Sequence, residues 1–318
     1  MTMQRTLSFP SMPNFRIIDP LQEPAGQLEG TQKLRLFRSS RPDLLTSDEV
    51  DVFRSLGIKC IIDFRSSKEY KKATGSKLLD SYYPVYKVKI PFRLKYKPED
   101  NVTLKRIKLN KPAEELSQVN PTNKHILLDF FKINYIWAVF TRAPWYVRFY
   151  SMFHLIVDIV LNTGYRYFVR VFARTVLNPK GLTDQYIDIL SYSQASICAA
   201  LKILSDEENL PAMVNCAHGK DRTGLVTAMV WTCLGKSHNF IATDYALSEV
   251  ELEPIKDRVR DEIVGQFHMS EKFTSARAEH MLGALKYLDN NYGSVSEYMS
   301  SIGFGPEDQE RLKRNLLA

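Results

Sequence analysis

Cysteine is scarce in this sequence, with four residues among 318: Cys60, Cys198, Cys216 and Cys233. None forms a C-x-x-C pair, and the cysteines and six histidines do not have the spacing of a zinc site. A disulfide-stabilised scaffold and a bound metal are therefore not expected, and we predict a reducing, cytoplasmic compartment. Cys60, Cys198 and Cys233 lie in apolar segments and are expected to be inert core residues.

Long hydrophobic runs and glycine-rich nucleotide motifs are also absent. The first residues, MTMQRTLSFPSMPNF, lack the apolar segment of a signal peptide, and the longest apolar stretch, at 149–161, is too short to span a bilayer. There is no G-x-G-x-x-G, and a Walker loop is excluded because Val214 and Asp221 occupy its glycine and Ser/Thr positions. No cofactor is therefore predicted.

Positive charge is concentrated in one part of the chain. The net charge is +7, but residues 85–175 hold 16 Lys/Arg and only 6 Asp/Glu. A local excess of this kind favours an acidic substrate or an anionic surface over nucleic acid.

The pattern of apolar residues predicts an arm at 1–33 and one α/β domain at 34–318. A helix is expected from Thr46, which suits an N-cap, to Gly57, which suits a C-cap, followed by the buried strand IKCIIDF. AMVNC at 212–216 is predicted as a second buried strand, and a helix follows it up to Gly235. We expect a central, largely parallel sheet with helices on both sides.

An insert at about 98–177 is predicted to interrupt this domain, as a polar loop at 98–125 and a helical block at 126–177. Before it, apolar residues alternate with lysine, arginine and proline from Tyr86 to Lys97, which predicts a strand. Pro91 favours an edge position. The cations are typical of a protected edge strand, and they would also suit phospholipid headgroups or an acidic partner.

The segment from Cys216 to Arg222 carries the chemistry. A loop between a buried strand and a helix directs backbone N–H groups at one centre, and the helix N-terminus adds positive potential. An arginine at its end can bind two phosphate oxygens, and a thiol at its base is favoured as thiolate. Such a thiolate can attack phosphorus to form a phosphocysteine, and Thr223 could hydrogen-bond the sulfur.

The run Cys216-Ala217-His218-Gly219-Lys220-Asp221-Arg222-Thr223-Gly224 resembles the C-x(5)-R loop of the cysteine-dependent tyrosine and dual-specificity phosphatases, above all the bacterial-type tyrosine phosphatases. FRSSRPDLLT, GIKCIIDFRS, GLTDQYIDIL and YGSVSEYMSSIGF are similar to further elements of that family. The resemblance implies a tyrosine-phosphatase-like α/β domain, with Cys216 as nucleophile, Arg222 as phosphate ligand and the rest of the run as substrate-binding loop.

The general acid has two candidates. The resemblance points to Asp221, immediately before the loop arginine; Asp63 is the alternative, although Asp63 and Arg65 also suit a structural ion pair at a strand end. Two positions depart from the family pattern. Asn215 stands where a histidine is usual, and His218 stands where a small residue is usual.

Three functions remain open from the sequence. The first is a phosphatase for phosphotyrosine or dual-specificity protein substrates, and the second is a phosphoinositide phosphatase. The third is a phosphate-binding module with weak catalysis, which retention of Cys216, Asp221 and Arg222 argues against.

The block at 126–177 has its own alternatives. It holds Trp137 and Trp145 and the spaced arginines Arg142, Arg148, Arg166, Arg170 and Arg174. It could be structural packing, a lid over the site, or an element attracted to an anionic membrane surface. Peripheral membrane association is therefore an expectation of the sequence.

Overall fold

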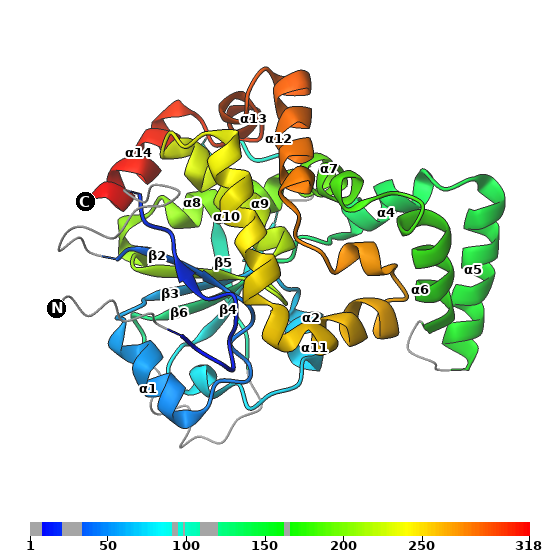
Figure 1. Ribbon diagram of the computed structural model, residues 1–318, viewed down its shortest axis with the longest axis horizontal. Helices are drawn as coiled ribbons and strands as arrows, with labels where there is room; N and C mark the ends of the chain where they lie inside the picture. Colours follow the sequence, from blue (N-terminus) through cyan, green and yellow to red (C-terminus); the bar gives the residue numbers. More distant parts are fainter. Residues whose placement is uncertain (1–7, 21–33, 91–94, 98, 109–119, 162–165) are drawn as a thin grey trace.

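The computed structural model describes residues 8–20, 34–90, 95–97, 99–108, 120–161 and 166–318. A seven-stranded sheet in the order β1-β2-β7-β3-β6-β4-β5 forms its centre (Figure 1). The pairs β2–β7, β7–β3, β3–β6 and β6–β4 are parallel, whereas β1–β2 and β4–β5 at the two ends are antiparallel. The predicted α/β class and largely parallel sheet are confirmed. The strands are β1 Arg16–Ile17, β2 Leu36–Ser39, β3 Cys60–Asp63, β4 Val85–Lys89, β5 Thr103–Arg106, β6 Lys124–Leu127 and β7 Ala212–Asn215.

Alternating side chains of the central strands pack on opposite faces of the sheet. Ile61 and Met213 belong to one apolar cluster, whereas Ile62 and Val214 belong to the other. The smaller cluster lies under α1 (Ser47–Ser55) and receives Phe9 and other residues of the N-terminal arm. The larger cluster contains α7 Leu182–Tyr192, α8 Gln194–Leu204, α9 Asp221–Cys233, α10 His238–Glu251, α12 Ala278–Tyr292, α13 Val295–Ser301 and α14 Pro306–Leu317.

Local sequence signals account for the elements next to the site. Thr46 and Glu49 form the capping box that starts α1, and Gly57 follows its end with a φ of +66°. β7 is buried along its whole length between β2 and β3, and α9 begins five residues after Cys216. The carboxyl ends of β3, β6 and β7 therefore meet at one edge of the sheet, where ligand sites of parallel sheets lie.

The prediction of a loop at 98–125 and of a helical block from 126 was wrong at two segments. Thr103–Arg106 and Lys124–Leu127 are strands of the sheet, and β6 lies between β3 and β4 with His125, Ile126 and Leu127 buried. Periodicity cannot distinguish a short, fully buried strand from the beginning of a helix. The helical part starts only at Ile133.

The strand with alternating cations is not the edge strand. β4 ends at Lys89 and pairs on both sides, with β6 and β5, so β5 is the edge. The alternation itself is confirmed from Tyr86 to Lys89, because Tyr86 and Val88 are half-buried and buried whereas Lys87 and Lys89 are exposed. Pro91 lies outside the described residues. β4 is paired on both sides because residues 103–106 form a strand, β5, beside it. The polar composition of these residues had predicted a loop.

The aromatic block forms α4 (Ile133–Thr141), α5 (Trp145–Val160) and α6 (Arg166–Phe172), which continues into η2 (Ala173–Leu177). α5 and α6 stand side by side at the end of the molecule away from both termini (Figure 1). α4 contacts α7, where Arg142 and Lys180 both pair with Asp188. Among the described helices, none is by itself long and apolar enough to cross a membrane; the bent pair α7–α8 meets those criteria by length and composition only.

The remaining helical segments are short. They are α2 Ser67–Lys72, η1 Leu78–Ser81, η3 Glu207–Asn209, η4 Glu253–Ile255, α11 Lys256–Arg260, η5 Asp261–Gln266 and η6 Glu271–Phe273. Two of them, α2 and η5, contribute carboxylates to the site described below.

Candidate active site

The loop between β7 and α9 brings Cys216 to the carboxyl edge of the sheet. Cys216 follows directly on the central strand and is 1% exposed. Gly219 has a φ of +68°, and a Cβ there would lie 2.1 Å from the carbonyl oxygen of Ser39. Only glycine fits this position, because both the left-handed backbone and the close approach exclude a side chain.

Three distant groups hold the loop carbonyls from outside. Asn14 Nδ2 donates to the carbonyl of His218 (3.0 Å), Arg38 Nη2 to that of Gly219 (2.9 Å), and the backbone N–H of Arg41 to that of Ala217 (3.2 Å). In a trans peptide the carbonyl and the next N–H point in opposite directions. The N–H groups that follow these three carbonyls therefore point to the inside of the loop, which is the arrangement of an anion-binding nest.

Arg38 is a buried support that the sequence did not reveal. It is 0% exposed, and its Nη1 donates to Asp244 (2.6 Å) and to the Thr227 hydroxyl (3.1 Å). Burial, together with the positive charge of Arg16, lowers the pKa of Arg38 to about 10 despite the opposing Asp244. Arg16 also pairs with Asp244 at 3.1 Å, so the N-terminal arm and β2 are joined to α10 behind the loop.

Arg222 is bound on one side only. Its Nη1 donates to the carbonyl of Phe64 (2.9 Å) and to Glu69 (3.0 Å), and its guanidinium lies over the Phe131 ring at 4.9 Å. Within the described part of the chain, Nε and Nη2 have no hydrogen-bond partner, which leaves the fork for two phosphate oxygens. Burial would lower the pKa of Arg222, but the charges of Glu69 and Cys216 raise it.

Glu69 reaches Arg222 from the first turn of α2. Ser66 is the N-cap, and Glu69 Oε2 accepts from the backbone N–H of Ser66 at 2.8 Å, while Ser66 Oγ accepts from the N–H of Glu69 at 3.1 Å. The same carboxylate thus caps a helix and orients the loop arginine. The S-x-x-E spacing was visible in the sequence, but its link to Arg222 was not.

Asp221 lies at the N-terminus of α9, and its side chain is 26% exposed. Its Oδ1 accepts a 2.6 Å hydrogen bond from the buried hydroxyl of Tyr186, which is also 2.6 Å from that of Tyr245. Lys220 lies 3.4 Å from the same oxygen. Lys220 is fully buried and donates to the carbonyls of Phe273 (2.7 Å) and Ser275 (2.9 Å), so its ammonium is engaged by the protein.

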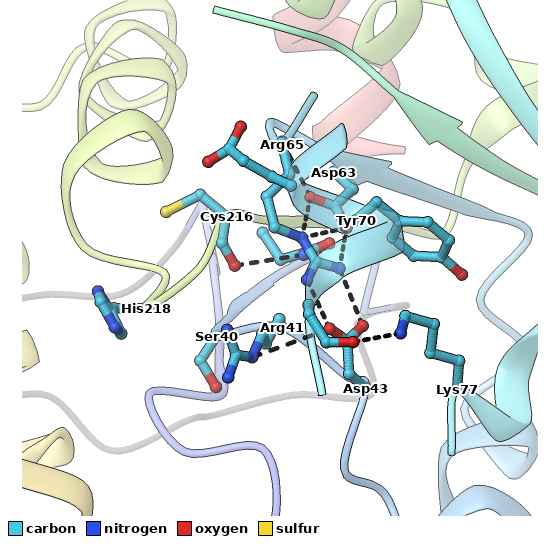
Figure 2. A network of polar contacts seen from close by, with 12 residues as sticks. Ser40, Arg41, Asp43, Asp63, Arg65, Tyr70, Lys77, Cys216 and His218 are labelled. Carbon is cyan, nitrogen blue, oxygen red and sulfur yellow. Dashed lines mark hydrogen bonds and ion pairs between the residues drawn. The ribbon is translucent and has the colours of Figure 1, made fainter. Parts of the chain in front are cut away.

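Asp63 belongs to a buried ion-pair network. Arg65 lies between Asp63 and Asp43 (Figure 2), at 2.6 Å from each. Burial alone would raise the pKa of Asp63, but Arg65 and His125 hold it well below its usual range. The structural pairing expected for Asp63 and Arg65 is present, and the neighbouring Asp43 completes it.

His218 connects the loop to η5. Its Nε2 is 2.9 Å from Glu262, which also pairs with Arg41 at 2.7 Å. Burial alone would raise the pKa of Glu262, but the hydrogen bond and charge of His218 and the charge of Arg41 lower it to about 2. A small residue at 218 could not make this contact.

The remaining loop residues occupy supporting positions. Thr223 is fully buried, and its hydroxyl has no hydrogen-bond partner among the described residues. Asn215 Nδ2 is 3.5 Å from the carbonyl of Cys216. A Cβ on Gly224 would lie 3.0 Å from the Tyr245 ring, so a glycine allows α9 to approach α10 closely.

Asp129 is a further carboxylate near Arg222 that sequence reasoning missed. It lies just beyond β6, and its Oδ1 accepts from the N–H of Phe131 at 2.9 Å. Burial and the nearby charge of Glu69 raise its pKa, against Lys132 and Arg222, which lower it. Among the described residues, no group of three or more His, Cys, Asp or Glu side chains could hold a metal ion.

Comparison with known proteins identifies a family that the chain matches over most of its length. The tyrosine phosphatase family matches residues 7–158 and 170–318, and the unmatched residues 159–169 include the end of α5 and the start of α6. A triple specificity protein phosphatase, PtpB, of Mycobacterium tuberculosis is 27% identical over 150 residues, which are 43% of this chain and 54% of that protein. A tyrosine-protein phosphatase of Nostoc commune is 25% identical over 146 residues, with shares of 43% and 50%. The chain spans about half the length of these curated relatives.

Proposed function

The chain belongs to the tyrosine phosphatase family, and we propose that it hydrolyses phosphate monoesters through a phosphocysteine. The orientation of the loop is the observation that carries this proposal. Three carbonyls are held outward, so N–H groups converge above Cys216, and Arg222 presents the free side of its fork. These groups match the equatorial oxygens of a phosphoryl group in transfer and are already in place before substrate binds.

The reaction has two steps. The Cys216 thiolate attacks phosphorus, the bond from phosphorus to the leaving oxygen breaks, and a carboxylic acid gives that oxygen its proton. A water molecule then attacks phosphorus and gives a proton to the same carboxylate, the sulfur–phosphorus bond breaks, and inorganic phosphate leaves. Thr223 would donate a hydrogen bond to the departing sulfur, and Ala217, His218, Gly219, Lys220 and Gly224 would shape the loop.

Asp221 is the proposed acid and base. Tyr186 donates to its Oδ1 and so fixes the carboxyl group, while the partial exposure of the side chain leaves Oδ2 accessible to a leaving oxygen. Asp63 is a poorer candidate because its two oxygens accept from Arg65 and its pKa is depressed. An acid must carry a proton near the working pH.

Phosphotyrosine or dual-specificity protein substrates are the proposed class, consistent with the printed descriptions of the two relatives. Phosphoinositides are the alternative, favoured by a cluster of exposed cations on β4 and β5. Lys87 lies directly opposite Lys105 there, a like-charge pair that is unfavourable unless an anion is bound. Lys220, by contrast, is bound to backbone carbonyls and adds little to this alternative.

The cytoplasm is the proposed compartment, because Cys60, Cys198, Cys216 and Cys233 are all free. Peripheral attachment to an anionic membrane is proposed with it and is argued from a particular surface below.

Turnover of para-nitrophenyl phosphate by the purified chain tests the activity, with Cys216→Ser as the matched control. A parallel panel of phosphotyrosine peptides, phosphoserine peptides and short-chain phosphoinositides tests the class of substrate. Phosphate binding without turnover of any of these would instead assign the third alternative, a binding module.

A further inference from the structure

Two polar side chains of α5 are buried while large apolar ones are exposed. The side of α5 that faces inward carries Ser151 and Asp158, which are 0% and 2% exposed, beside the buried Val147. The oxygens of Asp158 accept from the backbone N–H groups of Tyr167 and Phe168 and so cap the start of α6. Helices of water-soluble domains normally place polar residues outward.

The outer side of α5 is an apolar stripe. Trp145, Phe149, Phe153, Ile156 and Val160 recur at the spacing of one helix face and are 74, 75, 55, 57 and 75% exposed. The stripe is about 22 Å long, from a rise of roughly 1.5 Å per residue. Exposed apolar surface of this extent, on one side of an otherwise well-packed domain, marks an interaction surface.

The charges beside the stripe determine which partner fits it. From Trp145 to Leu177 the sequence contains four arginines and one acidic residue, Asp158. Arg170 and Arg174 are exposed and Arg148 is half-buried, whereas Asp158 is buried, so the charge offered to solvent is positive. Aromatic and aliphatic side chains next to arginines suit the boundary between acyl chains and anionic headgroups. A second copy of the chain would bring like charges together.

We propose that the α5 stripe, Trp145 to Val160, inserts into the interfacial layer of an anionic bilayer, with α5 parallel to the membrane plane. At 16 residues α5 is too short to cross the bilayer and suits this orientation. The inference rests on the membrane attachment proposed above and names the surface for it, which carries none of the proposed catalytic residues. It also names the contact through which a phosphatase would meet lipid or membrane-bound substrates.

Vesicle sedimentation with the full chain tests the proposal. Vesicles of phosphatidylcholine with 30% phosphatidylserine are compared with vesicles of phosphatidylcholine alone. Phe149→Gln/Phe153→Gln should weaken binding to the anionic vesicles at least tenfold, and Arg170→Gln/Arg174→Gln should lower the preference for them. Val52→Gln/Val250→Gln, which changes exposed residues of α1 and α10, should leave binding unchanged. Quenching of Trp145 emission by brominated lipid, lost in Trp145→Phe, should report insertion directly.

Two results would overturn the proposal. One is equal binding by wild type and Phe149→Gln/Phe153→Gln. The other is no vesicle binding together with a wild-type dimer, seen by sedimentation velocity, that this double variant dissociates; the stripe would then contact a second copy. Cys216→Ser should bind vesicles like wild type while it loses turnover, so failure of the membrane proposal and failure of the catalytic proposal are separate observations.

Discussion

Glu69→Gln should impair catalysis while leaving α2 folded. Glu69 binds Arg222 at 3.0 Å through one oxygen and the N–H of Ser66 at 2.8 Å through the other. A glutamine keeps the capping box through its side-chain oxygen, but its amide nitrogen, a donor, then takes the place of the oxygen that accepts from Arg222. What it removes is the negative charge that faces the guanidinium.

The size of the effect follows from that single contact. Hydrogen bonds between charged groups contribute about 1.5–3 kcal/mol and are roughly twice as strong as neutral ones. The substitution should therefore weaken the orientation of Arg222 by about 1.5–3 kcal/mol, which corresponds to roughly a 10–150-fold loss in kcat/KM. Glu69 also repels a phosphate dianion, and its neutralisation favours substrate binding. The loss should consequently lie in kcat, with KM unchanged or lower.

Steady-state kinetics test the expected loss of catalysis, and urea unfolding tests whether α2 stays folded. Ser66→Ala is the matched control: it removes the cap from the same helix, should reduce the free energy of unfolding by about 1 kcal/mol, and should leave kcat within about twofold of wild type. If Glu69→Gln left kcat unchanged, or if Ser66→Ala lowered kcat equally, Glu69 would be only a helix cap and not a positioning residue for Arg222.

Three further predictions concern the chemistry of the site and the stability of the fold at low pH. Cys216→Ser should abolish turnover and retain phosphate binding, measured by calorimetry with inorganic phosphate; residual turnover above about 1% would exclude the phosphocysteine. Asp221→Asn should lower kcat roughly 10²–10⁴-fold for poor leaving groups and less for good ones, whereas a larger loss in Asp63→Asn, measured on the same aryl phosphate series, would transfer the acid role to Asp63. Glu262 has a pKa near 2 in the folded chain and 4.5 ordinarily, so its pairing with His218 stabilises the fold above about pH 4.5 and is lost as the pH falls toward 2. Unfolding free energies of wild type and Glu262→Gln should thus differ at pH 7 and converge near pH 2, and a constant difference would contradict the pairing.

The parts of the site that are contiguous in sequence were predictable. AMVNC, the loop and the helix after it form one strand–loop–helix unit, and each part has a local signal: a short apolar run, a glycine that permits a tight loop, and helical spacing up to Gly235. The chemistry of Cys216 and Arg222 followed from that unit alone. Their roles remain proposals, but their positions on one loop are as the sequence indicated.

The parts that lie far apart in sequence could not be predicted. Glu69 and Arg222 are 153 positions apart, and Asn14 and His218 are 204 apart. Nothing in the composition of 1–33 distinguishes a residue that binds the loop from any other polar residue of an extended arm. The strand at 124–127 was missed for a related reason, since its burial comes from β3 and β4 on its two sides rather than from a pattern of its own.

The loop therefore takes its chemistry from local sequence and its shape from distant segments. Arg38 illustrates the difference. It contributes no group to the reaction, yet removing its side chain would leave the carbonyl of Gly219 without its partner and the carboxylate of Asp244 with Arg16 as its remaining ion pair. A buried acceptor that loses its donor costs about 1–3 kcal/mol, as much as many catalytic interactions contribute. Backbone N–H groups that converge on one centre are unfavourable in the absence of an anion. The loop keeps this shape because hydrogen bonds from distant segments hold its carbonyls outward. The arm and β2 are for this reason as necessary to the proposed phosphate site as the loop itself.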